Sequence, residues 1–223
     1  MELTKKILWF LFASFAIGIG LYPISYSFAA MRQNSVLATK SWELLMSNAY
    51  MTAFYTHISS GGLALLTGWS QFLRSWRNKY LTFHRYLGYF YVVAVFTSSI
   101  AGFIISFYST GGTVGGFGFG TLAVLWFSTN LMALISIKRG KVKEHEQWMM
   151  RNYSLAFGAV TLRICLPIIL MCGYTIVQAL AITSWICWIP NVIGVEIYIQ
   201  SQYGGILSKA KRNGDYMRES LNA

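Results

Sequence analysis

The sequence predicts an all-α, polytopic membrane protein with six transmembrane helices in one bundle and both termini in the cytoplasm. Three observations lead to this fold class. Hydrophobic residues make up 55% of the chain and charged residues 11%, against about 25% charged residues in soluble proteins. The apolar residues fall in runs of about 20, the helix length that crosses a ~30 Å hydrocarbon layer. Basic residues gather in the loops on one side of these runs, as the positive-inside rule requires.

A single integral membrane domain is expected over residues 1–223, because the apolar runs leave little chain for a soluble domain. Its predicted spans cover about 6–28, 52–73, 82–107, 116–137, 147–170 and 176–200. The first run stays apolar without a clear small-residue cleavage site, so we expect an uncleaved span rather than a signal peptide. Trp9 and Tyr26 flank this span as interfacial anchors. The segment SWELLM that follows it predicts a short helix at the membrane interface.

The second, third and fourth spans carry histidines and small residues. His57 lies early in the second span, and His84 starts the third. The fourth span opens on Gly112, Gly116 and Gly120, and this four-residue spacing places them along one helix face. Small residues on one face favour close packing of helices, or a flat ligand lying against the backbone.

The fifth span is the most informative part of the sequence, because it carries charge at membrane depth. It follows His145 and contains Arg151 and Arg163. A charged side chain costs about 2.5–3.5 kcal/mol at the centre of a bilayer, and such residues usually face a bundle interior or a wet cavity. Two arginines at different depths therefore need partners within the protein. The sixth span offers one carboxylate, Glu196.

Loop charges predict the orientation of the chain. In a six-span arrangement one side carries Lys5, Lys6, Arg74, Arg77, Lys79, Arg85, Lys138, Arg139, Lys141, Lys143, Lys209, Lys211, Arg212 and Arg218. The other side carries Arg32 and Lys40. The positive-inside rule then predicts a multi-pass protein of the cytoplasmic (inner) membrane. The formal charge of +11 is interpreted as topology and attraction to anionic lipid headgroups, with no nucleic acid as a partner.

Depth along the helices sorts the polar residues into two layers, of which the inner is the larger. The third and fifth spans both run outward, so His84 and His145 at their starts lie at one level near the inner face. Arg85 follows directly on the first of these histidines. Arg151 lies about 9 Å past the second, at 1.5 Å per residue. Glu196, near the inner end of the sixth span, is the expected partner of Arg151 or of a histidine.

The outer layer contains His57 and Arg163. The second span runs inward, so His57 lies near the outer face. Arg163 is about sixteen residues past the inner edge of the fifth span, or ~24 Å across the ~30 Å core. The two residues are therefore predicted to share a depth.

The inner layer supports a specific hypothesis, a b-type haem that takes part in electron transfer. Such a haem needs two neutral imidazoles at one depth on facing helices, with cations near its propionates. His84 and His145 meet the depth requirement, and Arg85 and Arg151 are candidates for the propionates. A metal held by the two histidines and a carboxylate is an alternative. So is a purely structural role, in which these side chains contact headgroups or cap helices.

The outer layer supports a different class of function. Here His57 and Arg163, with Glu196 as a further candidate ligand-binding residue, would serve a non-enzymatic transporter, a quinone- or anion-binding protein, or an assembly protein. A redox partner or a quinone is compatible with either hypothesis. No nucleophile–base pair can be picked out, so the sequence leaves open whether the protein is an enzyme, and it identifies no catalytic residue.

Four motifs carry a resemblance to a known family. They are HxxxG at His57, HRxxGxxY at His84, HxxWMxRxY at His145, and TLRxxLP, which contains Arg163. With these motifs the chain resembles the bacterial predicted membrane proteins grouped as domain of unknown function 2306. The resemblance covers the second to fifth spans and implies a multi-span integral membrane protein, without a settled activity.

The chain is similar, more loosely, to the four-helix cores of cytochrome b561-like and ferric-reductase-like proteins. In those cores alternate helices supply paired haem histidines at two levels. The third and fifth spans match one such pair by position. The fourth span contains no histidine, so the resemblance implies at most one complete bis-histidine site.

Overall fold

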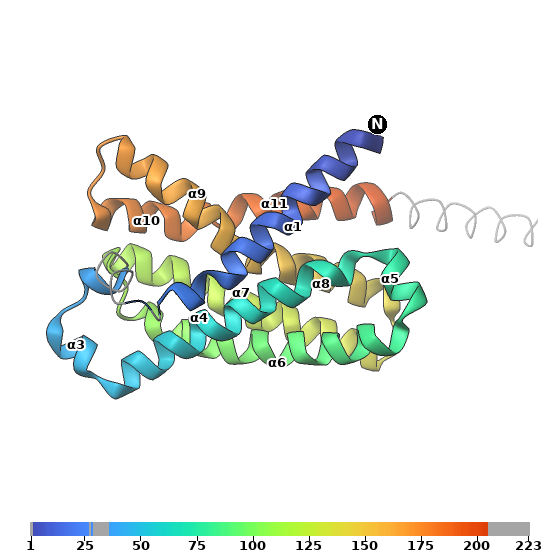
Figure 1. Cartoon of the computed structure of the whole chain (residues 1–223), viewed down its shortest axis with the longest axis horizontal. Coiled ribbons are helices and arrows are strands. Elements are labelled where there is room, and N and C mark those ends of the chain that lie inside the picture. Colours follow the sequence, from blue (N-terminus) through green and yellow to red (C-terminus); the bar gives the residue numbers. More distant parts are fainter. Residues whose placement is uncertain (1, 27, 29–35, 205–223) are drawn as a thin grey trace, which may run out of the picture.

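The computed structural model describes residues 2–26, 28 and 36–204 (Figure 1). Within these residues every regular element is a helix, which confirms the all-α fold class. In chain order they are α1 (Glu2–Ser25), η1 (Val36–Thr39), α3 (Trp42–Met46), α4 (Asn48–Gly68), η2 (Trp69–Phe72), α5 (Arg74–Lys79), α6 (Leu81–Ser106), α7 (Gly112–Lys138), α8 (Val142–Ala156), α9 (Gly158–Met171), α10 (Ile176–Ile186), α11 (Ile189–Ile199) and η3 (Gln200–Gly204). The short helix predicted at SWELLM is present as α3, where Oγ of Ser41 accepts a hydrogen bond from the amide of Leu44. Its place at the membrane interface stays a prediction.

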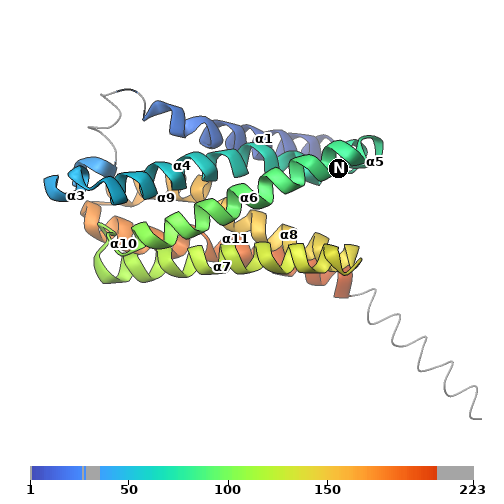
Figure 2. The same ribbon diagram turned by 90° about the horizontal axis from the view of Figure 1, so that it is seen from below.

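The long helices run back and forth between two ends of the bundle (Figures 1 and 2). We call the end that holds α5 and the starts of α1, α6 and α8 the basic end. Its described cations are Lys5, Lys6, Arg77, Lys79, Arg85, Lys138, Arg139, Lys141 and Lys143. Residues 2 and 204 both lie at this end. Which side faces the cytoplasm stays a prediction, and Arg32 and the four basic residues of the tail lie outside the described residues.

Five stretches of helix are long and apolar enough to cross a membrane: Leu3–Ser25, Leu81–Ser106, Gly112–Lys138, Val142–Met171 and Ile176–Gly204. The chain is therefore a multi-pass membrane protein. The helix α4 is not among the five, although its 21 residues span about 31 Å at 1.5 Å per residue. The six-span count therefore stays a prediction that depends on α4.

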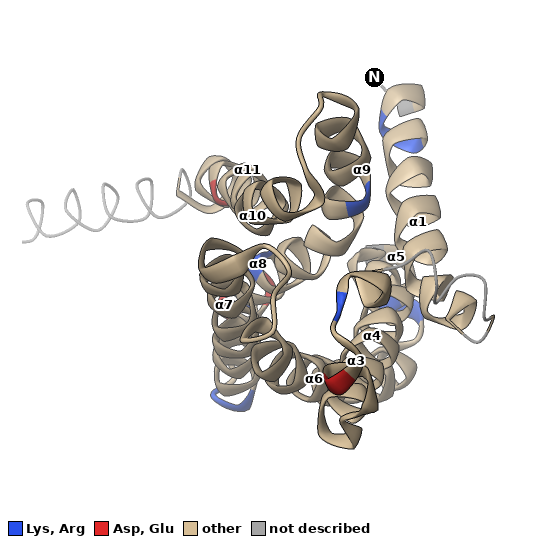
Figure 3. Ribbon diagram, turned by 90° about the vertical axis from the view of Figure 1, so that its left-hand side faces the viewer, with Lys and Arg blue, Asp and Glu red and all other residues tan. Residues whose placement is uncertain are grey.

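Most of the core lies among α4, α6, α7 and α8, and the junction of α10 and α11 adds Cys187 and Trp188. In Figures 1 and 3, α1 and α9–α11 lie to one side of the other four long helices. Lys, Arg, Asp and Glu take up little of the ribbon in Figure 3, and most of it is drawn in the colour of other residues. Tyr91, Val95 and Cys187 are fully buried in the core, and Trp126 and Tyr153 nearly so. These aromatic and branched side chains fill the space between the helices.

Glycines set the closest helix contacts. A Cβ added to Gly118 of α7 would lie 2.3 Å from Oγ of Ser184 in α10. At the crossing of α1 and α4, a Cβ on Gly62 would lie 2.6 Å from the carbonyl oxygen of Gly20. Of the predicted glycine series, Gly116 and Gly120 face Ser106 of α6. Packing therefore accounts for these two positions.

The last two predicted spans are each interrupted. The fifth divides between α8 and α9 at Phe157, and the sixth divides between α10 and α11 at residues 187–188. Gly158 lies at the first interruption, and a Cβ there would be 3.4 Å from the carbonyl oxygen of Cys187 in the second. The amide of Asn191 donates to the carbonyls of Ser154 (3.3 Å) and Cys187 (3.0 Å). One side chain thus satisfies carbonyls of both interrupted helices, as the absence of water in a bilayer core requires.

Candidate functional site

The two histidines of the predicted inner layer lie together at the basic end. His84 belongs to the first turn of α6 and His145 to the first turn of α8. Each ring lies within electrostatic range of the other, and Arg77 and Arg85 are also within range of His84. Nδ1 of His145 lies 2.9 Å from the carbonyl oxygen of Ala133. A carbonyl only accepts, so Nδ1 of His145 is the donor in this contact.

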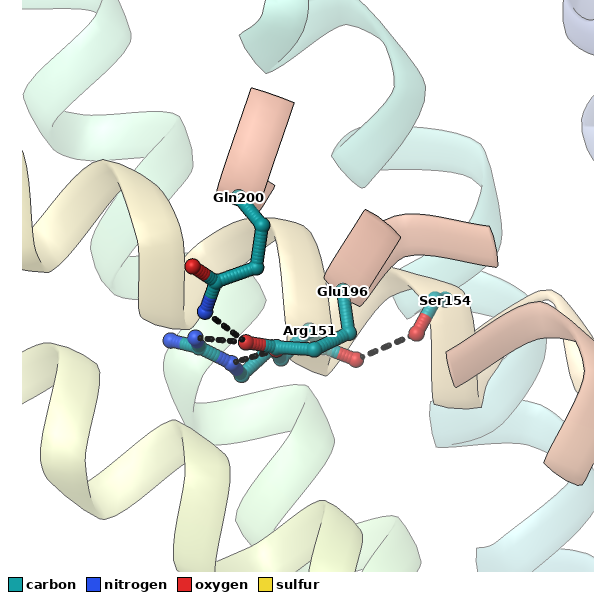
Figure 4. Close-up of polar contacts among 4 residues, drawn as sticks. All are labelled: Arg151, Ser154, Glu196 and Gln200. Carbon is teal, nitrogen blue, oxygen red and sulfur yellow. Dashed lines mark hydrogen bonds and ion pairs between the residues drawn. The ribbon is translucent and has the colours of Figure 1, made fainter. Parts of the chain in front are cut away.

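Arg151 has its carboxylate partner within the bundle (Figure 4). Its Nε donates to Oε2 of Glu196 at 2.8 Å, and its Nη2 donates to Oε1 at 3.1 Å. Gln200 donates to the same carboxylate at 3.2 Å, and the guanidinium lies 4.8 Å from the ring centroid of Trp148. The sequence predicts Arg151 or a histidine as the partner of Glu196, and in the structure the partner is Arg151. This bidentate contact occupies both groups, so neither is a free ligand-binding charge.

A second ion pair at the basic end was not expected. The sequence pattern places Glu146 in a solvated basic loop, and the structure corrects this. Arg77 of α5 donates to Oε1 of Glu146 in α8 at 2.6 Å, and Tyr203 donates to Oε2 at 3.2 Å. The carboxylate thus joins three parts of the chain that are distant in sequence. The pairing depends on how α5 folds against α8, which the spacing of charges does not reveal.

The residues around His84 do not fit a haem. The pocket that His84 lines together with Gln71 and Arg77 has a volume of about 10 Å³, which is close to the space of one water molecule. Arg85 is exposed, and Arg151 is already neutralised by Glu196. Among the described residues no group of three or more His, Cys, Asp or Glu side chains is placed to hold a metal ion. The haem and metal hypotheses thus gain no support from the geometry.

His57 is held firmly between α4 and α6, toward the end opposite to the basic one. Its Nδ1 donates to the carbonyl oxygen of Ser98 at 2.9 Å, and Oγ of Ser98 donates to the carbonyl of His57 at 2.9 Å. The ring also lies against Gly102, where an added Cβ would be 2.8 Å from Nδ1. The absence of a side chain at Gly102 is therefore what leaves room for the imidazole.

Arg163 lies near His57, as the depth argument predicts. It projects from α9, is half-buried, and its field reaches the His57 ring. Its Nη1 donates to the carbonyl of Ala159 at 3.1 Å, and its Cζ lies 4.2 Å from the ring centroid of Tyr22 in α1. Ala159 is one turn closer to the middle of the span. The guanidinium therefore points toward the middle of the span and not toward its nearer end, to which a snorkelling arginine would extend.

No carboxylate accompanies Arg163 in the part of the chain that the structure describes. The ion pairs found there join Arg77 to Glu146, Lys141 to Glu144 and Arg151 to Glu196. Among the described residues, Arg163 contacts a single neutral carbonyl and the face of a phenol ring. An arginine has five N–H donors, so most of its hydrogen-bonding capacity is unused by these contacts.

An aromatic group, which we call the tyrosine cluster, lies beside Arg163. It consists of Tyr22, Tyr26, Tyr50, Phe54 and Tyr108, with neighbouring ring centroids 5.5–6.3 Å apart. They come from α1 and the turn directly after it, from α4, and from the turn after α6. From the sequence, Tyr26 is expected only as an interfacial anchor, and the cluster is not predicted. The feature of the sequence that points to such a cluster is the recurrence of tyrosine near the ends of the apolar runs.

The loop over the tyrosine cluster is tied to the turn after α6. Lys40 donates to the carbonyl of Tyr108, and the hydroxyls of Thr39 and Thr110 lie 2.7 Å apart. Burial lowers the pKa of the Lys40 ammonium below its usual value. These contacts close this end of the bundle over the buried residue Leu37.

Sequence reasoning also missed a buried polar network in the core. Tyr91 donates to Oδ1 of Asn152 at 2.6 Å, and Nδ2 of Asn152 donates to the carbonyl of Trp126 (2.8 Å) and to Oγ1 of Thr129 (2.9 Å). This network joins α6, α7 and α8. The hydroxyl of Tyr91 and the amide of Asn152 have their partners within the protein, so we interpret the network as fixing the packing of these helices rather than as a ligand site.

The fold and these polar contacts define an integral helical membrane protein in which His57 lies near Arg163, a guanidinium with no carboxylate partner among the described residues. The family described as "Predicted membrane protein (DUF2306)" matches residues 54–199, more than half of the chain. The chain belongs to this family, which confirms the resemblance drawn from the four histidine and arginine motifs. No curated protein and no solved structure matches the chain. The looser similarity to cytochrome b561-like cores stays a prediction.

Proposed function

We propose that this membrane protein binds a ligand through an oxyanion, a carboxylate or phosphate group, that pairs with Arg163 beside His57. This is the anion-binding form of the transporter hypothesis. It makes the protein a binding or carrier protein, and it assigns no catalytic step to either residue.

The observation that carries the proposal is the unpaired charge of Arg163. A cation at membrane depth is costly, and an unpaired buried charge is more costly than a paired one. Arg151 in the same predicted span solves this problem with Glu196. Arg163 has no carboxylate among the described residues. A ligand oxyanion would supply the missing charge, and the guanidinium fork suits it because it binds such groups with two parallel hydrogen bonds.

The nature of the charge favours an oxyanion over a neutral quinone. A quinone carbonyl accepts a hydrogen bond from an arginine but leaves its charge uncompensated. His57 donates its Nδ1–H to the carbonyl of Ser98 and supplies no negative charge that could compensate the guanidinium. A negatively charged group is therefore the better complement.

The interrupted helices support a transport role. In many transporters the binding site lies near helices that are broken within the membrane. Here the interruptions of α8–α9 and α10–α11 lie against each other at Gly158. Thr161 of α9, two residues before Arg163, accepts a hydrogen bond from the side-chain amide of Asn191 at 3.0 Å. The candidate site thus lies on a segment attached directly to a break.

Thermal unfolding in an uncharged detergent tests the proposal, with inorganic phosphate and octanoate as probes. We expect at least one probe to raise the melting temperature of the wild-type protein, because a ligand that binds the folded state stabilises it. Arg163→Gln should abolish this shift. Arg163→Lys should retain part of it, because it keeps the charge but loses the bidentate geometry. His57→Ala should weaken the shift.

Arg85→Gln is the matched control, because it removes an exposed arginine at the basic end. It should leave the probe-dependent shift unchanged. A wild-type protein that neither probe stabilises, or an Arg163→Gln variant that folds and keeps the full shift, would overturn the proposal. In the latter case Arg163 would be only a structural clamp on α1 and α9.

A further inference from the structure

We infer that the ligand is an anionic amphiphile, which reaches Arg163 sideways from the lipid between α1 and α9 and leaves its chain along these helices. This inference rests on the proposed function and specifies the ligand class and its route. It depends on which side of Arg163 a ligand can approach.

The route from the water at this end of the bundle is closed by described residues. Tyr26, Tyr50 and Phe54 of the tyrosine cluster and Leu37 of the loop are 4–6% exposed. The hydrogen bonds of the adjoining loop to the turn after α6 hold this cover in place. A free aqueous anion would have to displace packed aromatic side chains to reach the guanidinium.

The route through the bundle is closed as well. His57 occupies the space between α4 and α6, with its ring against Gly102 and Ser98. The core beyond it is filled by large side chains such as Tyr91 and Trp126. The sides of Arg163 that face these helices therefore offer no path.

The side toward α1 is different, because α1 is the least enclosed of the candidate spans. In its most apolar stretch 11% of the residues are buried, against 28% or more in the other four spans. The crossing with α4 at Gly20 and Gly62 holds α1 on one side. Tyr22 meets Arg163 across the boundary between α1 and α9. In Figure 3, α1 stands at the edge of the bundle beside α9.

Exposed aliphatic side chains lie close in sequence to both contacting residues, Tyr22 and Arg163. Leu21 and Ile24 of α1 are 46% and 60% exposed, and Ile164 and Ile168 of α9 are 45% and 52% exposed. A half-buried cation bordered by exposed aliphatic side chains complements a molecule with a negative head and a hydrocarbon chain. Burial of each CH₂ group contributes about 0.8 kcal/mol, so chain length should govern affinity.

A chain-length series tests the inference, with melting temperature again as the measurement. The probes are inorganic phosphate, butyrate, octanoate and palmitate, with hexadecanol as the uncharged control for the chain. We expect the concentration for half-maximal stabilisation to fall at least tenfold from butyrate to palmitate. Arg163→Gln should lose the response to every carboxylate, and hexadecanol should leave the wild-type protein unchanged.

A matched pair of variants tests where the chain lies. Ile168→Ser on α9 should weaken palmitate binding and leave butyrate binding unchanged. Ile193→Ser on α11 changes an isoleucine of similar exposure, 54%, and should affect neither probe. Equal loss of palmitate binding in both variants would contradict the proposed route.

The outcomes separate the inference from the proposed function. If butyrate or phosphate binds through Arg163 as tightly as palmitate, the inference of an amphiphilic ligand is wrong and the proposed oxyanion site stands. If no anion binds, or if hexadecanol binds as well as palmitate, both fail. An increase of affinity with chain length that requires Arg163 supports both.

Discussion

Two arginines of one predicted span show how differently a membrane protein can manage a buried charge. Arg151 binds Glu196 through two hydrogen bonds. Arg163 donates a hydrogen bond to the carbonyl of Ala159 in its own helix, and its guanidinium lies over the ring of Tyr22. The first arrangement is electrostatically complete and stabilises the packing of α8 on α11. The second has no carboxylate among the described residues, and the proposed ligand site rests on this difference.

The paired arginine makes a prediction about stability. Glu196→Gln removes the countercharge of Arg151 and one of its two strong hydrogen bonds, so we expect a loss of about 1.5–3 kcal/mol. Thermal unfolding in detergent measures it as a lower melting temperature. Glu144→Gln is the control, because Glu144 forms an exposed pair with Lys141, worth about 0–1 kcal/mol. Equal effects in the two variants would show that the Arg151–Glu196 pair does not stabilise the fold.

At the scale of elements, the sequence predicts the helices better than their interruptions. The apolar runs predict six helical spans. The rise per residue of a helix then predicts that His84 lies level with His145, and that His57 lies level with Arg163. The breaks at Phe157 and Cys187 fall within continuous apolar sequence, so hydropathy does not register them. Pro190 is a local signal for the second, since it lacks an amide hydrogen. The partners of each charge depend on rotation about the helix axes, which depth alone does not determine.

The crossing of α1 and α4 makes a prediction about an element. Gly62→Ala places a methyl group 2.6 Å from the Gly20 carbonyl and 2.8 Å from Pro23, so α1 must shift. We expect a loss of about 1–3 kcal/mol from overpacking, together with weaker probe binding because Tyr22 moves with α1.

Gly194→Ala in α11 is the control for this variant, since nothing lies within 4 Å of its added methyl group. It should be neutral or stabilise the protein by up to about 1 kcal/mol, as alanine favours a helix over glycine. Unchanged stability and unchanged probe binding in Gly62→Ala would show that α1 is not held at this crossing.

At the scale of the whole molecule, the open question is whether α4 crosses the membrane. Five stretches qualify by length and apolarity, and α4 does not. Yet α4 packs within the bundle and contributes Ala64 and Leu65 to its core. The less apolar sequence of α4 suits a helix that is enclosed by others rather than exposed to lipid.

Cysteine labelling of sealed vesicles tests this directly, after Cys165, Cys172 and Cys187 are replaced by alanine. Residue 38 precedes α4 and residue 143 follows α7, and both positions are exposed. If α4, α6 and α7 all cross, Ala38→Cys and Lys143→Cys lie on opposite sides. An impermeant maleimide should then label only one of them until the vesicles are opened. Labelling of both from the same side would mean that α4 does not cross.

The central claim is that Arg163 pairs with the oxyanion of a membrane ligand. Native mass spectrometry of the protein, released from lipid in a mild uncharged detergent, tests it without a choice of probe. We predict an anionic amphiphile bound one to one to the wild-type protein and to Arg85→Gln, and absent from Arg163→Gln. An adduct retained equally by folded Arg163→Gln, or a wild-type protein that carries no anion and takes up none when palmitate is added, would contradict the account.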